Sequence, residues 1–133
     1  MIKCFIGSKG SGKTKTLIEL TNKAAESTNG SVVCIEKGDK LKHEITYKAR
    51  LIDTDYYGVG DAASLYGFVA GILASNSDIT DLFIDSALKI CGNDVPAFEA
   101  ILPKVAAIAE DVNLVMTLSI AVEECPDSIK AYV

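Results

Sequence analysis

The sequence contains very little arginine and histidine. Of its 13 basic residues only Arg50 is an arginine, and His43 is its single histidine. Enzymes that transfer a phosphoryl group from a nucleotide to a small molecule typically surround that group with several arginines, because a guanidinium group can bond two phosphate oxygens at once. One arginine cannot surround a phosphoryl group in this way, so the composition argues against a kinase of this kind.

Positive charge is also scarce relative to negative charge. The chain has 13 lysines and arginines against 18 aspartates and glutamates, which gives a net charge of −5. A negative protein is repelled by phosphate backbones and by anionic lipids, so we expect nucleic acid to be an unlikely primary partner. The lysines cluster only between Lys37 and Lys42, where Asp39 interrupts them, and we interpret this stretch as a solvated loop.

Long apolar runs and metal-binding cysteine patterns are both missing. The longest apolar stretch, residues 65–74, is too short to cross a bilayer, so we expect no membrane partner. Cys4, Cys34, Cys91 and Cys125 lack the short paired spacing of a zinc site. Three of them lie in or beside apolar runs, which is typical of reduced thiols in a core. We therefore expect a cytoplasmic protein.

The size and pattern of the chain predict one α/β domain over residues 1–133. Hydrophobic residues make up 49% of the sequence, which suits a globular core. Short β-branched runs alternate with longer helical patterns, as in βαβ units. We predict a three-layer α/β/α fold with a mainly parallel five-stranded sheet, whose strands are residues 2–6, 31–36, 49–53, 82–85 and 114–118.

Three main helices are expected between the strands. The first begins near Lys13 and stops at residues 29–30, the second runs from Ala62 to about Ser75 behind an Asp61 cap, and the third begins at residues 93–96. Gly67 and Gly71 fall on one face of the second helix, where we expect a close approach to the sheet. Pro103 interrupts the third helical pattern and predicts a kink or a split.

One glycine-rich segment matches the phosphate-binding pattern G-x-x-x-x-G-K-[ST] at every fixed position. An apolar strand precedes it and a helical pattern follows it, as the P-loop (Walker A) motif requires. The backbone N–H groups would surround the phosphates, Lys13 would reach the β- and γ-phosphates, and the Thr14 hydroxyl would bind magnesium. The predicted nucleotide-binding residues are Gly7, Ser8, Lys9, Gly10, Ser11, Gly12, Lys13 and Thr14.

Apart from the glycine-rich segment, one acidic residue fits the same magnesium-bound nucleotide. Asp85 follows the short apolar run at residues 82–84, as the magnesium-binding acid of a Walker B strand does. We predict that Asp85 and Thr14 hold Mg²⁺. A carboxylate at a strand end can also begin a turn or cap a helix, and this alternative stays open.

A competing motif raises the question of GTP. Asp55 and Gly58 form D-x-x-G, which senses the metal and γ-phosphate in GTPases. The guanine-reading element N-K-x-D should follow it, but the only similar stretch, residues 22–25, lacks the aspartate and lies on the first helix. ATP is therefore our prediction, and GTP remains possible.

Taken together, these segments resemble the recombinase-type (RecA-like) ATPase core of the P-loop NTPases. The resemblance rests on the glycine-rich segment, on residues 34–36 and on residues 83–86, where an acid is followed by serine. It implies that Glu36 activates the attacking water and that Asp85 binds the metal. The chain departs from the family at Leu118 and Ser119, where the family has an amide side chain that senses the nucleotide. It also has no DNA-binding loops, so the resemblance does not imply a function on DNA.

Three functions follow as expectations. The first is binding of Mg-ATP with slow or partner-dependent hydrolysis, in which Lys13 and Glu36 are catalytic and an arginine arrives from a partner. The second is a non-enzymatic switch, in which ATP orders residues 58–60. The third is a small-molecule kinase that uses Asp53 or Asp55 as a base.

The same resemblance predicts the strand order 3-2-4-5-1. The first strand would then be an edge of the sheet, which invites pairing with a second copy or another protein. The alternative is that residues 128–133 fold back and cover this edge.

Overall fold

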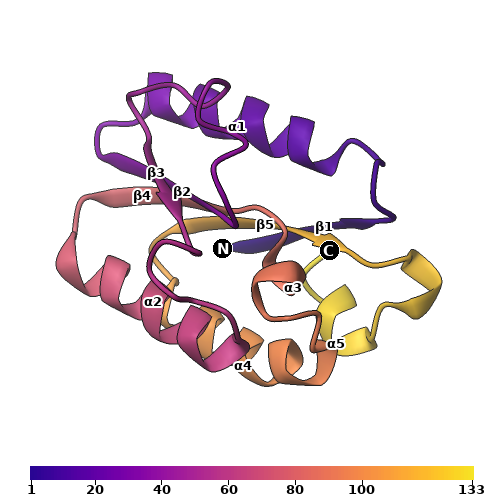
Figure 1. The fold of residues 1–133 in the computed structure, drawn as a ribbon. Helices are drawn as coiled ribbons and strands as arrows, with labels where there is room; N and C mark the ends of the chain where they lie inside the picture. Colours follow the sequence, from indigo (N-terminus) through magenta and orange to yellow (C-terminus); the bar gives the residue numbers. More distant parts are fainter.

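Five parallel strands form one sheet through the centre of the molecule (Figure 1). The computed structural model describes residues 1–133. The strand order is β1-β5-β4-β2-β3, which confirms the predicted arrangement. The observed bounds differ from the predicted ones by no more than a few residues: β1 Ile2–Gly7, β2 Ser31–Glu36, β3 Arg50–Asp53, β4 Ile79–Ile84 and β5 Asn113–Ser119.

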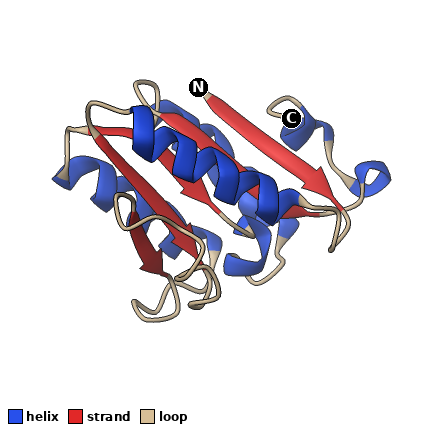
Figure 2. Cartoon of the chain, turned by 90° about the horizontal axis from the view of Figure 1, so that it is seen from above, coloured by secondary structure: helices blue, strands red, loops and turns tan.

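Helices cover both faces of this sheet. One long helix, α1 (Lys13–Ser27), lies alone across one face, as Figure 2 shows from above. Two long helices, α2 (Ala62–Ser75) and α4 (Val95–Ile108), lie on the other side together with the short α3 (Ala87–Ile90) (Figure 1). The chain ends with a 3₁₀ turn, η1 (Val122–Glu124), and a short helix, α5 (Asp127–Lys130). The predicted three-layer α/β arrangement is therefore present.

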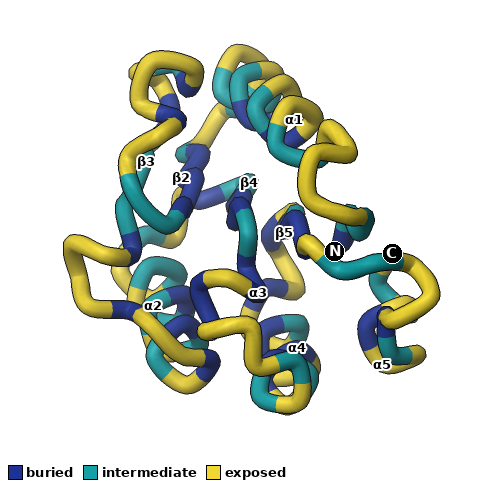
Figure 3. Tube along the Cα trace, turned by 45° about the vertical axis from the view of Figure 1, so that its right-hand side comes forward, coloured by how far each residue is buried: buried dark blue, intermediate teal, exposed yellow.

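The central strands are apolar on both sides, which explains why both faces are covered. In β2, Val32 and Cys34 pack toward α1, whereas Val33 and Ile35 belong to the larger cluster beneath the sheet. Side chains alternate between the faces of a strand, so a continuous apolar run needs a helical layer on each side. Figure 3 shows the strand interiors as buried and the connecting loops as exposed.

The predicted Asp61 cap is present and Asp94 caps the third long helix, but Pro103 does not split that helix. Asp61 accepts a hydrogen bond from the Ser64 N–H at 2.8 Å, and the Asp94 carboxylate accepts one from the Ala97 N–H at 3.1 Å. Helix α4 is continuous across Pro103, which is exposed, so the prediction of a split is wrong. Burial of neighbouring side chains such as Leu102 offsets the cost of the missing N–H.

The expected close approach at Gly67 and Gly71 is also wrong. Both glycines are exposed, and a Cβ atom added at either one would have no neighbour within 4 Å. Helix α2 instead packs through Ala62, Leu65 and Val69, which are buried. The two glycines share a face, as their spacing requires, but it is the solvent face.

The C-terminal tail lies beside the edge strand β1 (Figure 2). The Cys4 N–H donates to the Tyr132 carbonyl oxygen at 2.7 Å, and the Gly7 N–H donates to the Ile120 carbonyl oxygen at 3.0 Å. Ile129 of α5 is 0% exposed and joins the main core. The expectation of an open edge is therefore corrected, because the tail occupies part of it.

Two further features concern burial. None of the helices is both long enough and apolar enough to pass through a bilayer.

All four cysteines are buried free thiols, and burial raises the pKa of Cys4 and of Cys34 to about 12. These thiols are therefore neutral core residues at physiological pH.

Removal of residues 126–133 is expected to destabilise the protein and to cause self-association. The truncation exposes the Cys4 N–H and removes Ile129, whose burial stabilises the fold by about 1.5–3 kcal/mol. Light scattering and denaturant unfolding measure the two effects. Removal of Val133 alone is the control, because it leaves Ile129 and Tyr132 in place. A truncated chain that stays monomeric with unchanged unfolding free energy would contradict this role for the tail.

Candidate functional site

The glycine-rich loop, residues 7–14, joins β1 to α1 and is largely exposed (Figure 3). Gly10 and Gly12 have φ angles of 86° and 89°, in the left-handed region that favours glycine. Gly12 also precedes the first residue of α1, which has no side-chain cap and no acidic residue in its first turn. The first N–H groups of α1 therefore face outward with a partial positive charge.

Lys13 folds its side chain back into this loop. Its ammonium group donates to the Ser8 carbonyl oxygen at 3.0 Å and to the Ser11 hydroxyl at 3.2 Å. Loss of water around the amine lowers the pKa of Lys13, and the negative charge of Asp85 acts in the opposite direction. The loop thus holds the Lys13 ammonium group beside the N-terminus of α1, which is a favourable place for an anion.

Asp85 links three elements at the carboxyl end of the sheet. It follows β4 directly and is 8% exposed. One of its oxygens, Oδ1, accepts hydrogen bonds from the Thr14 hydroxyl at 3.0 Å and from the Thr117 hydroxyl at 2.7 Å. The structure therefore brings the predicted pair, Thr14 and Asp85, into direct contact.

Thr117 is a site residue that the sequence analysis missed. Besides donating to Asp85, its hydroxyl accepts a hydrogen bond from the Ser86 N–H at 2.7 Å. Ser86 has a positive φ of 56°, a strained backbone conformation for a residue other than glycine. Thr117 thus fixes both the Asp85 carboxylate and the turn that follows it.

Glu36 ends β2, next to β4 in the sheet. It is 3% exposed, and its Oε2 atom accepts a hydrogen bond from the Leu41 N–H at 3.0 Å. Burial raises the pKa of Glu36 above its ordinary value, and the Leu41 hydrogen bond partly opposes this rise. The neighbouring charge of Asp85 raises it further.

A single cavity of about 590 Å³ brings most of these residues together. Lys13, Thr14, Glu36 and Asp85 all line it, and so do Lys9, Gly10 and Gly12. The other predicted loop residues, Gly7, Ser8 and Ser11, do not line the cavity. Ser8 and Ser11 instead accept hydrogen bonds from the Lys13 ammonium group, which itself lines the cavity.

Residues 37–42, which the sequence analysis interpreted as a solvated loop, also contribute to this cavity. Lys37 and Lys40 line the same cavity as the glycine-rich loop, because their segment follows β2 at the carboxyl edge of the sheet. The cavity has six lysines but only two carboxylates, Glu36 and Asp85. These lysines are Lys9, Lys13, Lys15, Lys37, Lys40 and Lys89. Arg50 is exposed at the start of β3 and is not among the lining residues.

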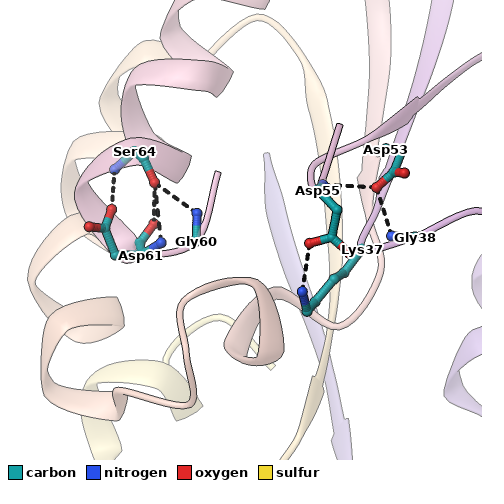
Figure 4. A network of polar contacts seen from close by, with 7 residues as sticks. All are labelled: Lys37, Gly38, Asp53, Asp55, Gly60, Asp61 and Ser64. Carbon is teal, nitrogen blue, oxygen red and sulfur yellow. Dashed lines mark hydrogen bonds and ion pairs between the residues drawn. The ribbon is translucent and has the colours of Figure 1, made fainter. Parts of the chain in front are cut away.

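Asp55 of the competing motif and Asp53, the other candidate base of a kinase, have other partners (Figure 4). Asp53 accepts hydrogen bonds from the Gly38 and Asp55 N–H groups, both at 2.8 Å. Asp55 pairs with the Lys37 ammonium group at 2.6 Å. Neither aspartate lines the cavity, so the structure does not bring them together with Lys13.

Comparisons with known proteins supply no family for this chain. No protein-family model matches the sequence, and no curated protein matches it either. The functional argument therefore rests on the geometry of the site.

Substitution of Thr117 by valine is expected to lower the free energy of unfolding by about 2–3 kcal/mol. Valine keeps the shape but leaves the buried Asp85 oxygen and the Ser86 N–H without this partner. Denaturant unfolding measures the change. Thr117→Ser is the matched control, because it keeps the hydroxyl and loses only a methyl group. Equal stability of the valine variant and the unmodified protein would show that these two hydrogen bonds do not hold the site.

Proposed function

We propose that this chain is a P-loop domain, similar to the RecA-like ATPase core, that binds a magnesium-bound nucleoside triphosphate, with ATP as the ligand. The supporting observation is the hydrogen bond between Thr14 and Asp85. It joins the end of the glycine-rich loop to the acidic end of β4 inside one cavity that Lys13 also lines. A lysine, a hydroxyl and a carboxylate in this arrangement are the side chains that P-loop proteins use for phosphate and magnesium.

Backbone N–H groups and the Lys13 side chain would both bind the triphosphate. Lys13 and Thr14, at the uncapped start of α1, line the cavity, and the N–H groups of such a helix end favour phosphate oxygens. Lys13 supplies a cation within the loop. Its acceptors, the Ser8 carbonyl oxygen and the Ser11 hydroxyl, are neutral groups that a charged phosphate oxygen can replace. The cavity volume of about 590 Å³ lies in the usual range for small-molecule sites.

The donor set also fits magnesium. No group of three histidine, cysteine, aspartate or glutamate side chains could hold a metal by itself. Magnesium does not require one, because it keeps several waters and takes only one or two protein ligands beside phosphate oxygens. Thr14 and Asp85 would hold the ion, and when bound it neutralises charge on the phosphates.

Hydrolysis of the triphosphate is the proposed reaction, with Glu36 as the base. Its raised pKa makes the carboxylate a better proton acceptor than an ordinary surface glutamate. The site has no arginine to stabilise the charge of the transition state, since Arg50 lies outside the cavity. Turnover is therefore expected to be slow until a partner or a second copy supplies one.

One contact favours the switch as a second candidate function. Lys37 lines the cavity and also pairs with Asp55, at the start of the loop that contains Gly58 and Gly60. A triphosphate that attracts Lys37 would weaken this pair and release the loop, so the effect proposed for residues 58–60 is release and not the ordering expected from the sequence.

Substitution of Lys13 by alanine should weaken binding of an ATP analogue by roughly 10- to 100-fold, because a hydrogen-bonded charge is worth about 1.5–3 kcal/mol. The fold should remain, since the side chain contacts only the loop. Calorimetric titration with AMPPNP and magnesium measures affinity, and circular dichroism checks the fold. Lys23→Ala, on α1 but outside the cavity, is the control. Equal affinity of the Lys13 variant would refute the proposed function.

Substitution of Glu36 by glutamine should abolish ATP turnover and leave AMPPNP binding nearly unchanged. Glutamine can still accept the Leu41 hydrogen bond, but it cannot take a proton from water. Phosphate release over time measures turnover. Turnover that persists in the variant would exclude Glu36 as the base, and binding without any turnover in the unmodified protein would favour the switch.

A further inference from the structure

The cavity carries more positive charge than a magnesium-bound triphosphate needs. Six lysines line it against two carboxylates, although the whole chain has a net charge of −5. Only Lys37 among these lysines forms a salt bridge, and its partner is Asp55. A magnesium-bound triphosphate carries a net charge of about −2. After the two carboxylates and the Lys37–Asp55 pair are counted, it leaves about one positive charge of the cavity without an opposite charge.

Two of the remaining lysines stand apart from the glycine-rich loop. Lys40 follows β2, and Lys89 lies on α3 after β4. Strands β2 and β4 are neighbours, whereas β5 lies between β4 and the loop strand β1. Lys40 and Lys89 therefore approach the cavity from adjacent strand ends, on the side away from β1.

The backbone that carries Lys40 is anchored at two points. The Gly38 N–H donates to Asp53 at 2.8 Å (Figure 4), and the Leu41 N–H donates to Glu36 at 3.0 Å. Leu41 itself is 4% exposed, so the segment is packed into the protein. A cation on an anchored segment loses less conformational freedom when it binds an anion than one on a free loop.

The backbone that carries Lys89 is equally constrained. Leu88 and Ile90, on either side of it, are 3% and 1% exposed. The turn before α3 is fixed by the hydrogen bond from the Ser86 N–H to Thr117. The Lys89 side chain itself is exposed and lines the cavity.

We propose that Lys40 and Lys89 bind a second small anion, a phosphate or carboxylate group, in the same cavity and at the same time as the triphosphate. This inference rests on the proposed function, because it places the second anion beside a bound triphosphate. The second ligand of the protein is accordingly a small anionic molecule, in keeping with two lysines that line one cavity on fixed backbone.

The test is a calorimetric titration with inorganic phosphate, and in a second series with malonate, in the presence of saturating Mg-AMPPNP. The unmodified protein should bind at least one of these anions saturably. Lys40→Ala and Lys89→Ala should each weaken that binding about tenfold and change AMPPNP affinity less than about threefold. Lys42→Ala, a neighbouring lysine outside the cavity that pairs with Asp39, should change neither.

Several results would overturn the inference while leaving the proposed function intact. The first is that neither anion binds saturably to the AMPPNP complex of the unmodified protein. The second is that anion binding is unchanged in both Lys40→Ala and Lys89→Ala. The third is that these variants lose as much AMPPNP affinity as Lys13→Ala. The last result would assign both lysines to the triphosphate. A protein that binds no AMPPNP refutes the proposed function instead, and phosphate binding that still depends on Lys40 and Lys89 would then support the anion site.

Discussion

The site depends on the two hydrogen bonds that Asp85 Oδ1 accepts from Thr14 and Thr117. Thr14 lies in the first turn of α1, Asp85 follows β4, and Thr117 is on β5, so one carboxylate oxygen fixes three elements. An aspartate that is 8% exposed would be costly to bury without such partners. The same contact explains why the glycine-rich loop has a defined position over the sheet, because the helix that follows it is tied to the strand ends.

Charge is distributed unevenly over this molecule. The chain is acidic overall, yet lysines predominate around the cavity between the glycine-rich loop and the ends of β2 and β4. Such a cavity attracts anions while the rest of the surface repels polyanions such as nucleic acid. The scarcity of arginine then has a structural meaning, because lysines bind phosphate as point charges without the fixed fork that supports rapid phosphoryl transfer. This agrees with slow turnover or with help from a partner.

Much of this arrangement could be predicted from local sequence signals. The Asp61 cap and the contact of Thr14 with Asp85 follow from short motifs and from the geometry of parallel βαβ units. The strand order is the one that the resemblance to the RecA-like core implied. Thr117 could not be predicted, because its place beside Asp85 depends on the register that pairs Ile84 with Met116. The contribution of Lys40 and Lys89 to one cavity could not be predicted, because they lie far apart in sequence and reach it through the adjacency of β2 and β4. The position of the tail beside β1 likewise depends on long-range packing by Ile129.

The most direct test of the account is the magnesium dependence of AMPPNP affinity, measured by titration with magnesium and with EDTA. In the unmodified protein, magnesium should strengthen binding, because Thr14 and Asp85 are proposed to hold the ion beside the phosphates. Asp85→Asn should remove most of this strengthening, while Asp55→Asn, outside the cavity, should retain it. No AMPPNP binding by the unmodified protein at millimolar concentration, or loss of the magnesium effect only in the Asp55 variant, would contradict the account.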